Sequence, residues 1–379
     1  MNAPRRLMKE AVERGVFPSG VLLVGSAVEV LFEEAYGLAV PGTGEAAATG
    51  AFYDLASLTK PLAAATSAMI LAESGRLLPE SALGELLPGV FGKDKAGITV
   101  AQLLSHASGL PAYRHYYRKL QFLPAGKRRG RLLKLIAAES LESAPGTRAV
   151  YSDLGYMLLL EILEKAAGMD LDGLFREAVA EPLGIGDLFF IPLESGLMPA
   201  FLRKREALMA GRSFAATEAC PWRGRLLVGE VHDDNAWVTG GVAAHAGLFG
   251  TARAVWELVS ALVRAFHGEQ AGLFLPETVR SFLTRREAPG SFVMGFDTPT
   301  RPGSSSGRFF SDLSVGHLGF TGASFWADLE KRVIVVLLTN RVHPTRKNEE
   351  IRAFRPLIHD AVMEELGFGR AEPPQGIRP

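Results

Sequence analysis

Segments typical of β-strands lie near both ends of this chain, and the pattern of the residues between them is mainly helical. The stretches "SGVLLVGS" at 19–26 and "AVEVLFEEAYG" at 27–37 are short, apolar and bounded by glycines. Near the other end, "GASFWADLE" at 322–330 and "RVIVVLLTN" at 332–340 are separated by a charged turn, as in an antiparallel hairpin. A sheet assembled from such distant segments around a helical insertion predicts an α+β fold rather than alternating βαβ units.

Helix signals dominate the middle of the chain. The segment from Pro61 to Gly75 contains strong helix formers and ends at a glycine, as a helix C-terminus commonly does. Further helices are predicted at 7–16, 99–107, 153–167, 170–184 and 251–266, after Pro276, and at 349–366. One more strand is predicted at 291–298, "SFVMGFDT", before the loop "RPGSSSG".

The order of these elements predicts two lobes. The chain has 379 residues, of which 47% are hydrophobic, and this is enough to bury a sizeable core. We expect an α/β lobe with the antiparallel sheet, built from residues 1–57 and 234–379, and a mainly helical lobe of residues 58–233. Together they would form one catalytic unit with the active site between them.

The charge balance indicates a small ligand. The 41 basic and 41 acidic residues cancel, which argues against nucleic acid or an anionic membrane surface as a partner. The stretch "YRHYYRKLQFLPAGKRRGR" at 113–131 mixes basic and aromatic residues and would suit nucleic-acid binding. Because no other basic segment matches it, a solvated loop and helix face is favoured. The sequence does not indicate the oligomeric state.

Four further features of the sequence concern the location of the protein, its single cysteine and its cofactors. The N-terminal stretch "MNAPRRLMKEAVERGVF" is charged throughout and does not resemble a secretory signal, so we expect a cytoplasmic protein if this start is native. No stretch approaches eighteen uninterrupted apolar residues, so we expect no membrane span. The single cysteine, Cys220, is expected to be a packed thiol. Neither of the nucleotide-binding motifs G-x-G-x-x-G and G-x-x-x-x-G-K-[ST] occurs in the sequence, so no nucleotide cofactor is expected.

Ser57 and Lys60 in "DLASLTK" have the spacing of a nucleophile and its base. A serine hydroxyl needs a neighbouring base to take its proton, and lysine can serve if burial or nearby positive charge lowers its pKa. At positions i and i+3 of a helix the two side chains share one face. A helix-capping serine with a lysine nearby is the alternative, because S-x-x-K also arises by chance.

Two later motifs strengthen the catalytic interpretation. Tyr151, in "YSD", could share the serine proton if a neighbouring ammonium lowered its pKa below the usual value near 10. The alternative is a half-buried tyrosine at the start of the next helix. His317 precedes Gly319 by two positions, and a glycine in a strand allows close backbone approach to a substrate. The alternative for His317 is a polar strand residue.

Five segments together resemble the serine β-lactamase and penicillin-binding-protein superfamily, in its class C-like branch of esterases, D-amino-acid peptidases and carboxypeptidases. They are "FYDLASLTKPLAA", "ITVAQLLSHASGLP", "YSDLGYMLL", "GGVAAHAGLFGTA" and "GHLGFTGASFWADLEKRVIVVLLTNRVHP". The resemblance extends from about Val16 to His359, and "CPWRGRLLVGEVHDDNA" is similar to a subgroup of low-molecular-weight penicillin-binding proteins. It implies a β-lactamase/transpeptidase-like fold, with a central antiparallel sheet flanked by helices and an inserted helical lobe.

The resemblance also implies residue roles. Ser57 would be the acylated nucleophile, Lys60 its base and Tyr151 the proton shuttle, while the N–H groups of Ser57 and Phe320 would form the oxyanion hole. Asp153 stands where the family commonly has Asn and would hydrogen-bond differently.

The third family motif also departs from its usual form. Here it is His317-Leu318-Gly319 rather than Lys-Thr-Gly or His-Thr-Gly, and leucine lacks the hydroxyl that helps to hold a substrate carboxylate. Both departures weaken the case for penicillin-like anionic substrates.

For the remaining candidate site residues, structural roles are favoured. The run His232-Asp233-Asp234 contains metal-ligand types without a matching partner spacing, so a solvated turn is favoured over a metal site. His106 and His245 match family positions that shape the cavity walls.

The sequence therefore predicts a cofactor-independent serine hydrolase that acts through an acyl-enzyme on a small ester or amide. The first alternative is a penicillin-binding D-alanyl-D-alanine carboxypeptidase or β-lactamase, which would take a peptide or β-lactam. The second is a non-catalytic binding protein that keeps the fold, with Asp153 and Leu318 marking decay of the site.

Overall fold

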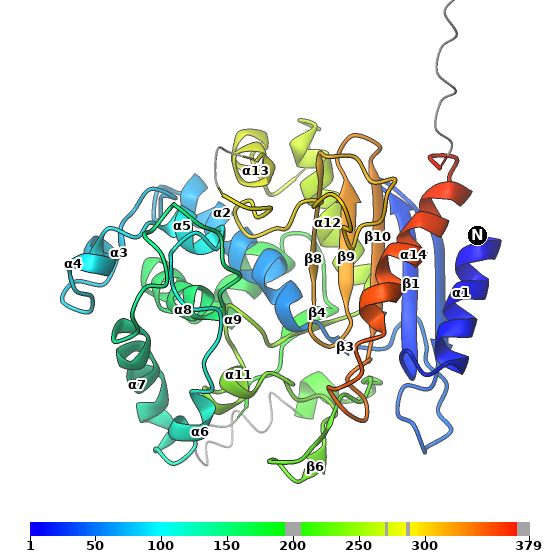
Figure 1. Ribbon diagram of the computed structural model, residues 1–379, viewed down its shortest axis with the longest axis horizontal. Helices are drawn as coiled ribbons and strands as arrows, with labels where there is room; N and C mark the ends of the chain where they lie inside the picture. The colour runs from blue at the N-terminus through cyan, green and yellow to red at the C-terminus, as the bar shows by residue number, and fades with distance from the viewer. Residues whose placement is uncertain (194–205, 270–271, 286–288, 370–379) are drawn as a thin grey trace, which may run out of the picture.

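The centre of the fold is a five-stranded antiparallel sheet. The computed structural model describes residues 1–193, 206–269, 272–285 and 289–369 (Figure 1). The strand order is β2-β1-β10-β9-β8. The strands are β1 (Ser19–Ser26), β2 (Val30–Gly37), β8 (Ser314–Leu318), β9 (Ser324–Asp328) and β10 (Val333–Thr339). Because Gly20 of β1 lies opposite Thr339 of β10, the predicted joining of the two chain ends in one antiparallel sheet is confirmed.

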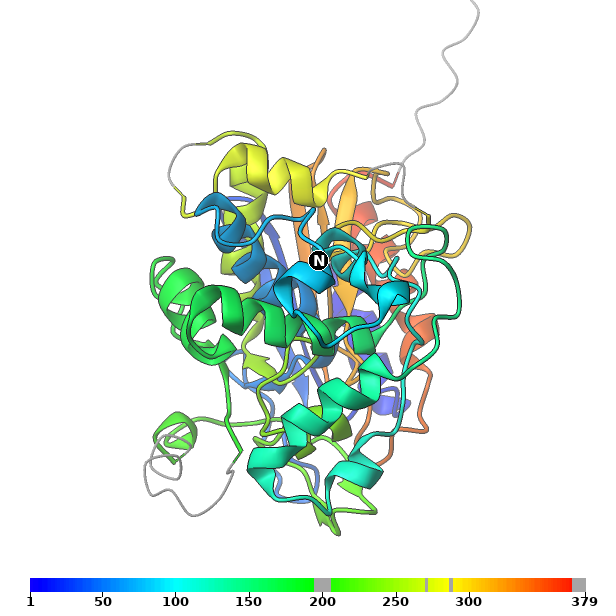
Figure 2. The ribbon, with the colours of Figure 1, turned by 90° about the vertical axis from the view of Figure 1, so that its left-hand side faces the viewer.

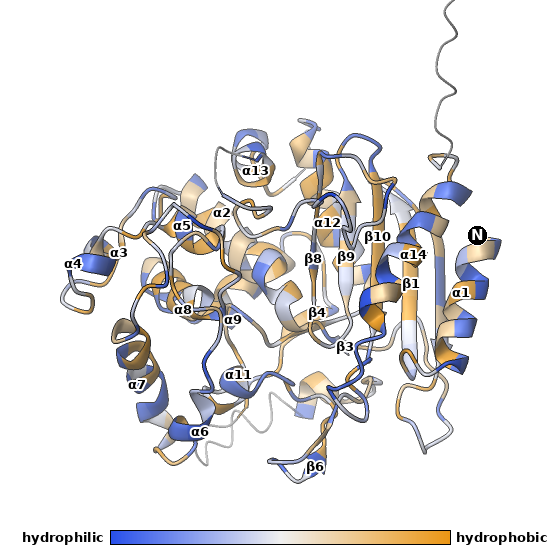
Figure 3. Ribbon diagram, in the orientation of Figure 1, coloured by the Kyte–Doolittle hydropathy of each residue, from blue (hydrophilic) through white to orange (hydrophobic). Residues whose placement is uncertain are grey.

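Both faces of the sheet are covered, which explains why β1, β9 and β10 are buried almost throughout. Leu22 and Val24 of β1 pack in a core cluster with residues of α1 (Asn2–Glu13) and α14 (Ile351–Glu365), while Val21 and Leu23 pack into a larger core on the other face. Helix α12 (Ala252–Phe266) contacts β1 and β10. Figure 3 shows the hydrophobic residues concentrated along β1 and β10.

Most of the other helices lie away from α1 and α14, at the left of Figure 1 and towards the viewer in Figure 2. They are α2 (Thr66–Glu73), α3 (Leu83–Leu86), α4 (Lys93–Ala96), α5 (Val100–Leu104), α6 (Tyr117–Leu120), α7 (Ala125–Ala137), α8 (Asp153–Ala167), α9 (Leu171–Phe175), α11 (Asp234–Val238) and α13 (Pro276–Leu283). One hydrophobic core continues from the sheet into these helices. The two-lobe division at residues 57–58 and 233–234 stays a prediction. Within the described residues, no helix is both long and apolar enough to cross a membrane.

The helix boundaries follow local capping chemistry. The Ser152 hydroxyl accepts the Gly155 N–H at 3.3 Å at the start of α8, and Gly168 ends this helix with φ +73°. The Thr251 hydroxyl accepts the Ala254 N–H at 3.2 Å and begins α12. The predicted helices at 153–167 and 251–266 are therefore confirmed almost to the residue.

The predicted strand at 291–298 is wrong. Gly295 has φ +98°, and the Val293 N–H donates to the Phe296 carbonyl at 2.9 Å, so the segment folds back on itself. Only isolated bridges remain, from Asp297 to Phe292 and to Gly316 of β8. A Cβ at position 295 would lie 2.3 Å from the Cβ of Ala65, which explains the glycine.

Candidate active site

Ser57 lies on a tight turn between a short strand and a helix. Strand β3 (Tyr53–Asp54) leads into Ala56, whose φ of +48° is unusual for a residue with a side chain. The Asp54 carboxylate holds this conformation, because its Oδ1 accepts the Ala56 N–H at 2.8 Å. The 3-10 turn Ala56–Leu58 and the wide helical turn Lys60–Ala65 then lead into α2. Such a costly local conformation is typical of a functional position.

The Lys60 side chain is completely buried and has three oxygen partners. Its Nζ donates to Ser57 Oγ at 2.9 Å and to the His245 carbonyl at 3.1 Å. The same Nζ lies 2.7 Å from Asp153 Oδ1, with which it forms an ion pair. An ammonium group has three hydrogens, so these three oxygens can satisfy it fully. The two members of the S-x-x-K motif are thus in direct contact.

The pKa of Lys60 shifts in the opposite direction from the one that the sequence suggested. Burial lowers the pKa, but the Asp153 carboxylate and the Tyr151 phenol raise it by more, so that it lies above the ordinary 10.5. The condition of a lowered pKa is not met, because Asp153 is the counter-ion of this ammonium. At neutral pH Lys60 is protonated.

Tyr151 completes the group around Ser57. Lys60 Nζ lies 4.8 Å from the centroid of the Tyr151 ring, and His106 packs against that ring at 4.5 Å between centroids. Burial raises the pKa of the Tyr151 phenol, and the Lys60 charge together with hydrogen bonding to Lys60 and Ser57 offsets only part of the rise. The phenol therefore also carries its proton at neutral pH. His106 holds the neighbouring backbone, since its Nδ1 accepts the Ser152 N–H at 3.0 Å.

Replacing Asp153 with asparagine should move the activity profile to lower pH. Without the carboxylate, burial dominates and the pKa of Lys60 falls. The rising limb of kcat/KM against pH should shift downward by about one to three units, and activity at pH 7 should increase. Steady-state assays from pH 6 to 11 would measure the shift. Asp312→Asn, an exposed substitution outside the cavity, is the control, and an unmoved limb in Asp153→Asn would contradict the expectation.

The His317-Leu318-Gly319 motif forms the end of β8 beside Ser57. His317 donates from Nδ1 to the Leu318 carbonyl at 3.0 Å, and burial and the Lys60 charge lower its pKa to about 3. His317 is therefore neutral, and its buried Nε2 has no partner among the described residues. A Cβ at position 319 would lie 2.7 Å from the Leu55 carbonyl oxygen. Only glycine allows this approach to the chain that carries the serine.

The predicted site residues converge on one cavity of about 580 Å³. Its lining includes Ser57, Tyr151, Asp153, His317, Gly319 and Phe320. Lys60 lies directly beneath Ser57, at the hydrogen-bond distance given above. Residues from three remote parts of the sequence thus meet at one cavity, and a cavity of this size suits a small organic substrate.

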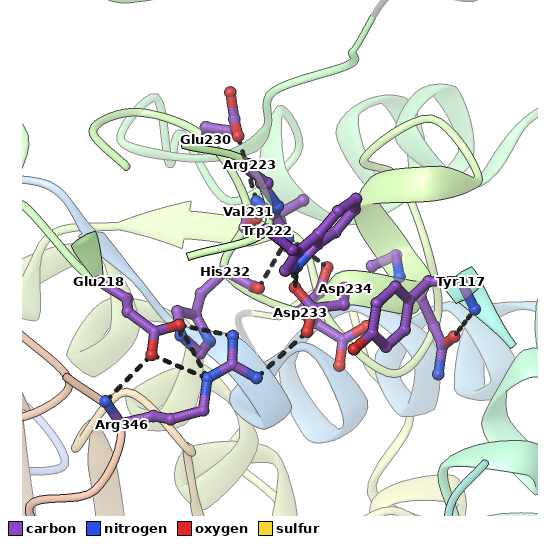
Figure 4. Close-up of polar contacts among 12 residues, drawn as sticks. Tyr117, Glu218, Trp222, Arg223, Glu230, Val231, His232, Asp233, Asp234 and Arg346 are labelled. Carbon is purple, nitrogen blue, oxygen red and sulfur yellow. Dashed lines mark hydrogen bonds and ion pairs between the residues drawn. The ribbon is translucent and has the colours of Figure 1, made fainter. Parts of the chain in front are cut away.

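The prediction of a solvated turn at His232, Asp233 and Asp234 is wrong. His232 and Asp234 are buried, and all three residues line the cavity. Figure 4 shows how the three side chains lie. His232 Nε2 lies 3.1 Å from Glu218 Oε2, and Asp233 Oδ1 lies 3.0 Å from Nε2 of His245. His245, through its carbonyl, is also a partner of Lys60.

Two arginines complete the network shown in Figure 4. Arg223 is 2.9 Å from Asp234 and 3.1 Å from Glu230, while Arg346 lies 3.1 Å from Asp234 and also pairs with Glu218. Sequence spacing carried no signal for the pairs of Arg346, because this residue is more than one hundred positions from its partners. The network fixes the part of the cavity wall that His232, Asp233, Asp234 and Arg346 form.

The basic stretch at 113–131 contributes more than a solvated face. Tyr113 and His115 line the cavity, and the Tyr117 N–H donates to Asn235 Oδ1 at 2.9 Å. The basic residues of α7 lie mostly exposed or half-exposed, as expected. Tyr113 and His115 are therefore part of the candidate site, which the sequence did not reveal.

An antiparallel sheet flanked by helices, with a serine and a buried lysine one turn apart beside the sheet edge, defines a β-lactamase/transpeptidase-like fold. The chain belongs to the Beta-lactamase family, whose model matches residues 4–359. A putative D-alanyl-D-alanine carboxypeptidase of Escherichia coli K12 is 30% identical over 366 residues, which cover 90% of this chain and 82% of the relative.

Solved structures show the same fold. The octameric penicillin-binding protein homologue from Pyrococcus abyssi matches 97% of this chain and 77% of its own, with a TM-score of 0.72 and 18% identity. EstCE1, a hydrolase with promiscuous acyltransferase activity, matches 94% of this chain and 98% of its own, with a TM-score of 0.69 and 20% identity. The predicted family resemblance and the α+β fold class are both confirmed.

Proposed function

We propose that this protein is a serine hydrolase that cleaves a small ester or amide through an acyl-enzyme on Ser57. The observation that carries the proposal is the 2.9 Å contact between Ser57 Oγ and the buried Nζ of Lys60, at the wall of a cavity that also contains Tyr151. A surface serine that merely caps a helix would have no reason to contact a lysine with no exposed area.

The chemistry needs only groups of the chain. In the productive form Lys60 is a neutral amine and takes the Ser57 proton as Oγ attacks the carbonyl carbon. The carbonyl oxygen becomes an oxyanion and accepts from the N–H groups of Ser57 and Phe320. The oxyanion then re-forms the carbonyl, the bond from the carbonyl carbon to the leaving group breaks, and Tyr151 gives its proton to the leaving group and recovers one from Lys60. Water then attacks the acyl-enzyme, returns a proton to Ser57 and releases the acid.

A covalent probe tests this proposal. Incubation with a fluorophosphonate should add the mass of one phosphonyl group, and peptide mapping should place it on Ser57. Short-chain p-nitrophenyl esters should be hydrolysed with a rate that rises toward alkaline pH, because the pKa of Lys60 is raised. An adduct on another residue would refute the proposed nucleophile. No adduct with any acylating probe, and no turnover, would favour the non-catalytic binding protein.

A second candidate function is a D-alanyl-D-alanine carboxypeptidase, the activity named for the E. coli relative. Arg341 and Arg355 line the cavity, are almost fully buried, and form no ion pair with a carboxylate of the described residues. Burial lowers the pKa of Arg355 to about 9. Uncompensated buried cations favour an anionic ligand. They could hold a substrate carboxylate in place of the hydroxyl that Leu318 lacks.

Release of D-alanine from an acylated D-alanyl-D-alanine peptide tests the second candidate. We expect Arg355→Met to raise KM for this peptide at least about tenfold and to leave KM for a neutral aryl ester within twofold. Equal effects on both substrates would contradict carboxylate binding. A stable adduct of a fluorescent penicillin on Ser57 would favour a penicillin-binding protein, and rapid hydrolysis of that penicillin would favour a β-lactamase.

A further inference from the structure

The loop that follows β8 presents one free backbone donor. The Phe320 N–H makes no hydrogen bond with any part of the chain that the structure describes, although the neighbouring Gly319 N–H donates to the Ala323 carbonyl at 2.7 Å. Phe320 also lines the cavity. If the proposed function holds, this N–H and that of Ser57 bind the oxyanion, and their separation must be fixed to a fraction of an ångström.

The Arg341 side chain contacts both the aromatic ring and the backbone carbonyl of Phe320. The guanidinium carbon of Arg341 lies 4.4 Å from the centre of the Phe320 ring, and Nε donates to the Phe320 carbonyl at 2.7 Å. Nη1 of Arg341 donates to the carbonyls of Arg346 and Asn348 at 3.0 and 2.6 Å. Only 6% of the surface of Arg341 is exposed, so this side chain is held in place and connects these backbone segments.

The imidazole of His232 also packs on the Phe320 ring. The two ring centres are 5.6 Å apart and the planes are inclined by 24°. His232 is itself fixed, because its ring Nε2 lies 3.1 Å from Glu218 Oε2 and its backbone N–H donates to Asp54 Oδ2 at 2.6 Å. The Phe320 side chain, although half exposed, therefore has two well-held neighbours.

Asp54 connects this loop to the nucleophile turn. Its Oδ1 accepts the N–H of Ala56, the residue before the first donor, at 2.8 Å. Its carbonyl accepts the hydroxyl of Thr321, the residue after the second donor, at 2.7 Å. Its Oδ2 accepts from His232. Asp54 is 2% exposed, so one buried residue links the neighbours of the two donors, Ala56 and Thr321, to the segment that contains His232.

We propose that Asp54 and Arg341 are positioning residues that hold the N–H groups of Ser57 and Phe320 at a fixed separation, and so form the oxyanion hole. The inference rests on the proposed function. It explains why an aspartate with three hydrogen-bonded neighbours precedes the nucleophile, and why a buried arginine packs on a phenylalanine at the cavity wall. Neither side chain needs to touch the substrate to act in this way.

Measurements of transition-state binding distinguish a positioning role of Asp54 and Arg341 from a merely structural one. The variants Arg341→Met, Thr321→Val and Asp54→Asn should each lower kcat for a neutral p-nitrophenyl ester about 10- to 100-fold, with KM changed less than threefold. The inhibition constant of phenylboronic acid, whose tetrahedral adduct on serine places an oxygen in the hole, should rise by the same factor. Arg341→Lys, which keeps the charge, should recover part of the loss. A neutral ester avoids any effect of Arg341 on carboxylates.

Arg308→Met is the matched control, because Arg308 lies 4.9 Å over the Phe309 ring but does not line the cavity. Unchanged kcat in both Arg341→Met and Thr321→Val would overturn the inference, as would a loss of kcat without weaker boronate binding. For a variant with a lowered melting temperature, the same two constants are measured at a temperature where it is folded. A wild-type protein that neither hydrolyses the ester nor reacts with a fluorophosphonate would instead refute the proposed function.

Discussion

Replacing Ser57 with alanine should lower kcat for aryl esters by at least ~10⁴-fold and abolish the fluorophosphonate adduct. The expected loss is large because no other serine or threonine hydroxyl among the described residues contacts Lys60. The fold should persist, since Lys60 keeps the Asp153 carboxylate and the His245 carbonyl as partners. Steady-state kinetics, intact mass and thermal melting measure the three effects.

A second serine provides the control for this substitution. Ser74, at the end of α2, donates to the Leu71 carbonyl at 3.0 Å and is remote from the cavity lining. Ser74→Ala should retain full turnover. If Ser57→Ala also hydrolysed the ester at the wild-type rate, the nucleophile would have to be sought elsewhere in the cavity.

Lys60→Met should lower kcat by at least ~10³-fold and also reduce stability. Methionine fills much of the same buried space but cannot take a proton from Ser57. It also leaves the Asp153 carboxylate, whose side chain is 17% exposed, without its cation at 2.7 Å. Breaking such a pair costs about 3 kcal/mol, which denaturant unfolding can measure.

The double variant Lys60→Met with Asp153→Asn separates the two effects. Removal of both charges should restore most of the lost free energy of unfolding, because no uncompensated charge remains. Turnover should stay at the level of Lys60→Met. Recovery of turnover in the double variant would show that the Lys60 amine is not the base. Tyr151 would then be the candidate base.

The sheet and the Ser57 centre were predictable because short-range signals define them. Two strand-like runs separated by a charged turn mark β9 and β10, and the capping residues Ser152 and Thr251 mark α8 and α12. The S-x-x-K spacing requires only one helical turn, so the contact between Ser57 and Lys60 follows from local geometry. Cys220 is buried, as its expected role as a packed thiol required.

Long-range electrostatics explain what the sequence did not reveal. The charge state of Lys60 depends on Asp153, which is contributed by a different helix. His232 and Asp234 appeared solvated because their partners Glu218, Arg223 and Arg346 follow no periodic spacing. The backbone turn at Gly295 likewise depends on close packing against Ala65. Each of these features requires the folded neighbours to be known.

The pairing of β1 with β10 has a consequence for synthesis of the protein. The nucleophile turn leaves the ribosome early, but the carbonyl that accepts from Lys60 belongs to a residue 185 positions later, and β10 emerges later still. A nascent chain therefore carries its serine for most of translation without a completed centre around it. Premature termination before β8 should yield a fragment that is exposed to proteases and does not react with a fluorophosphonate.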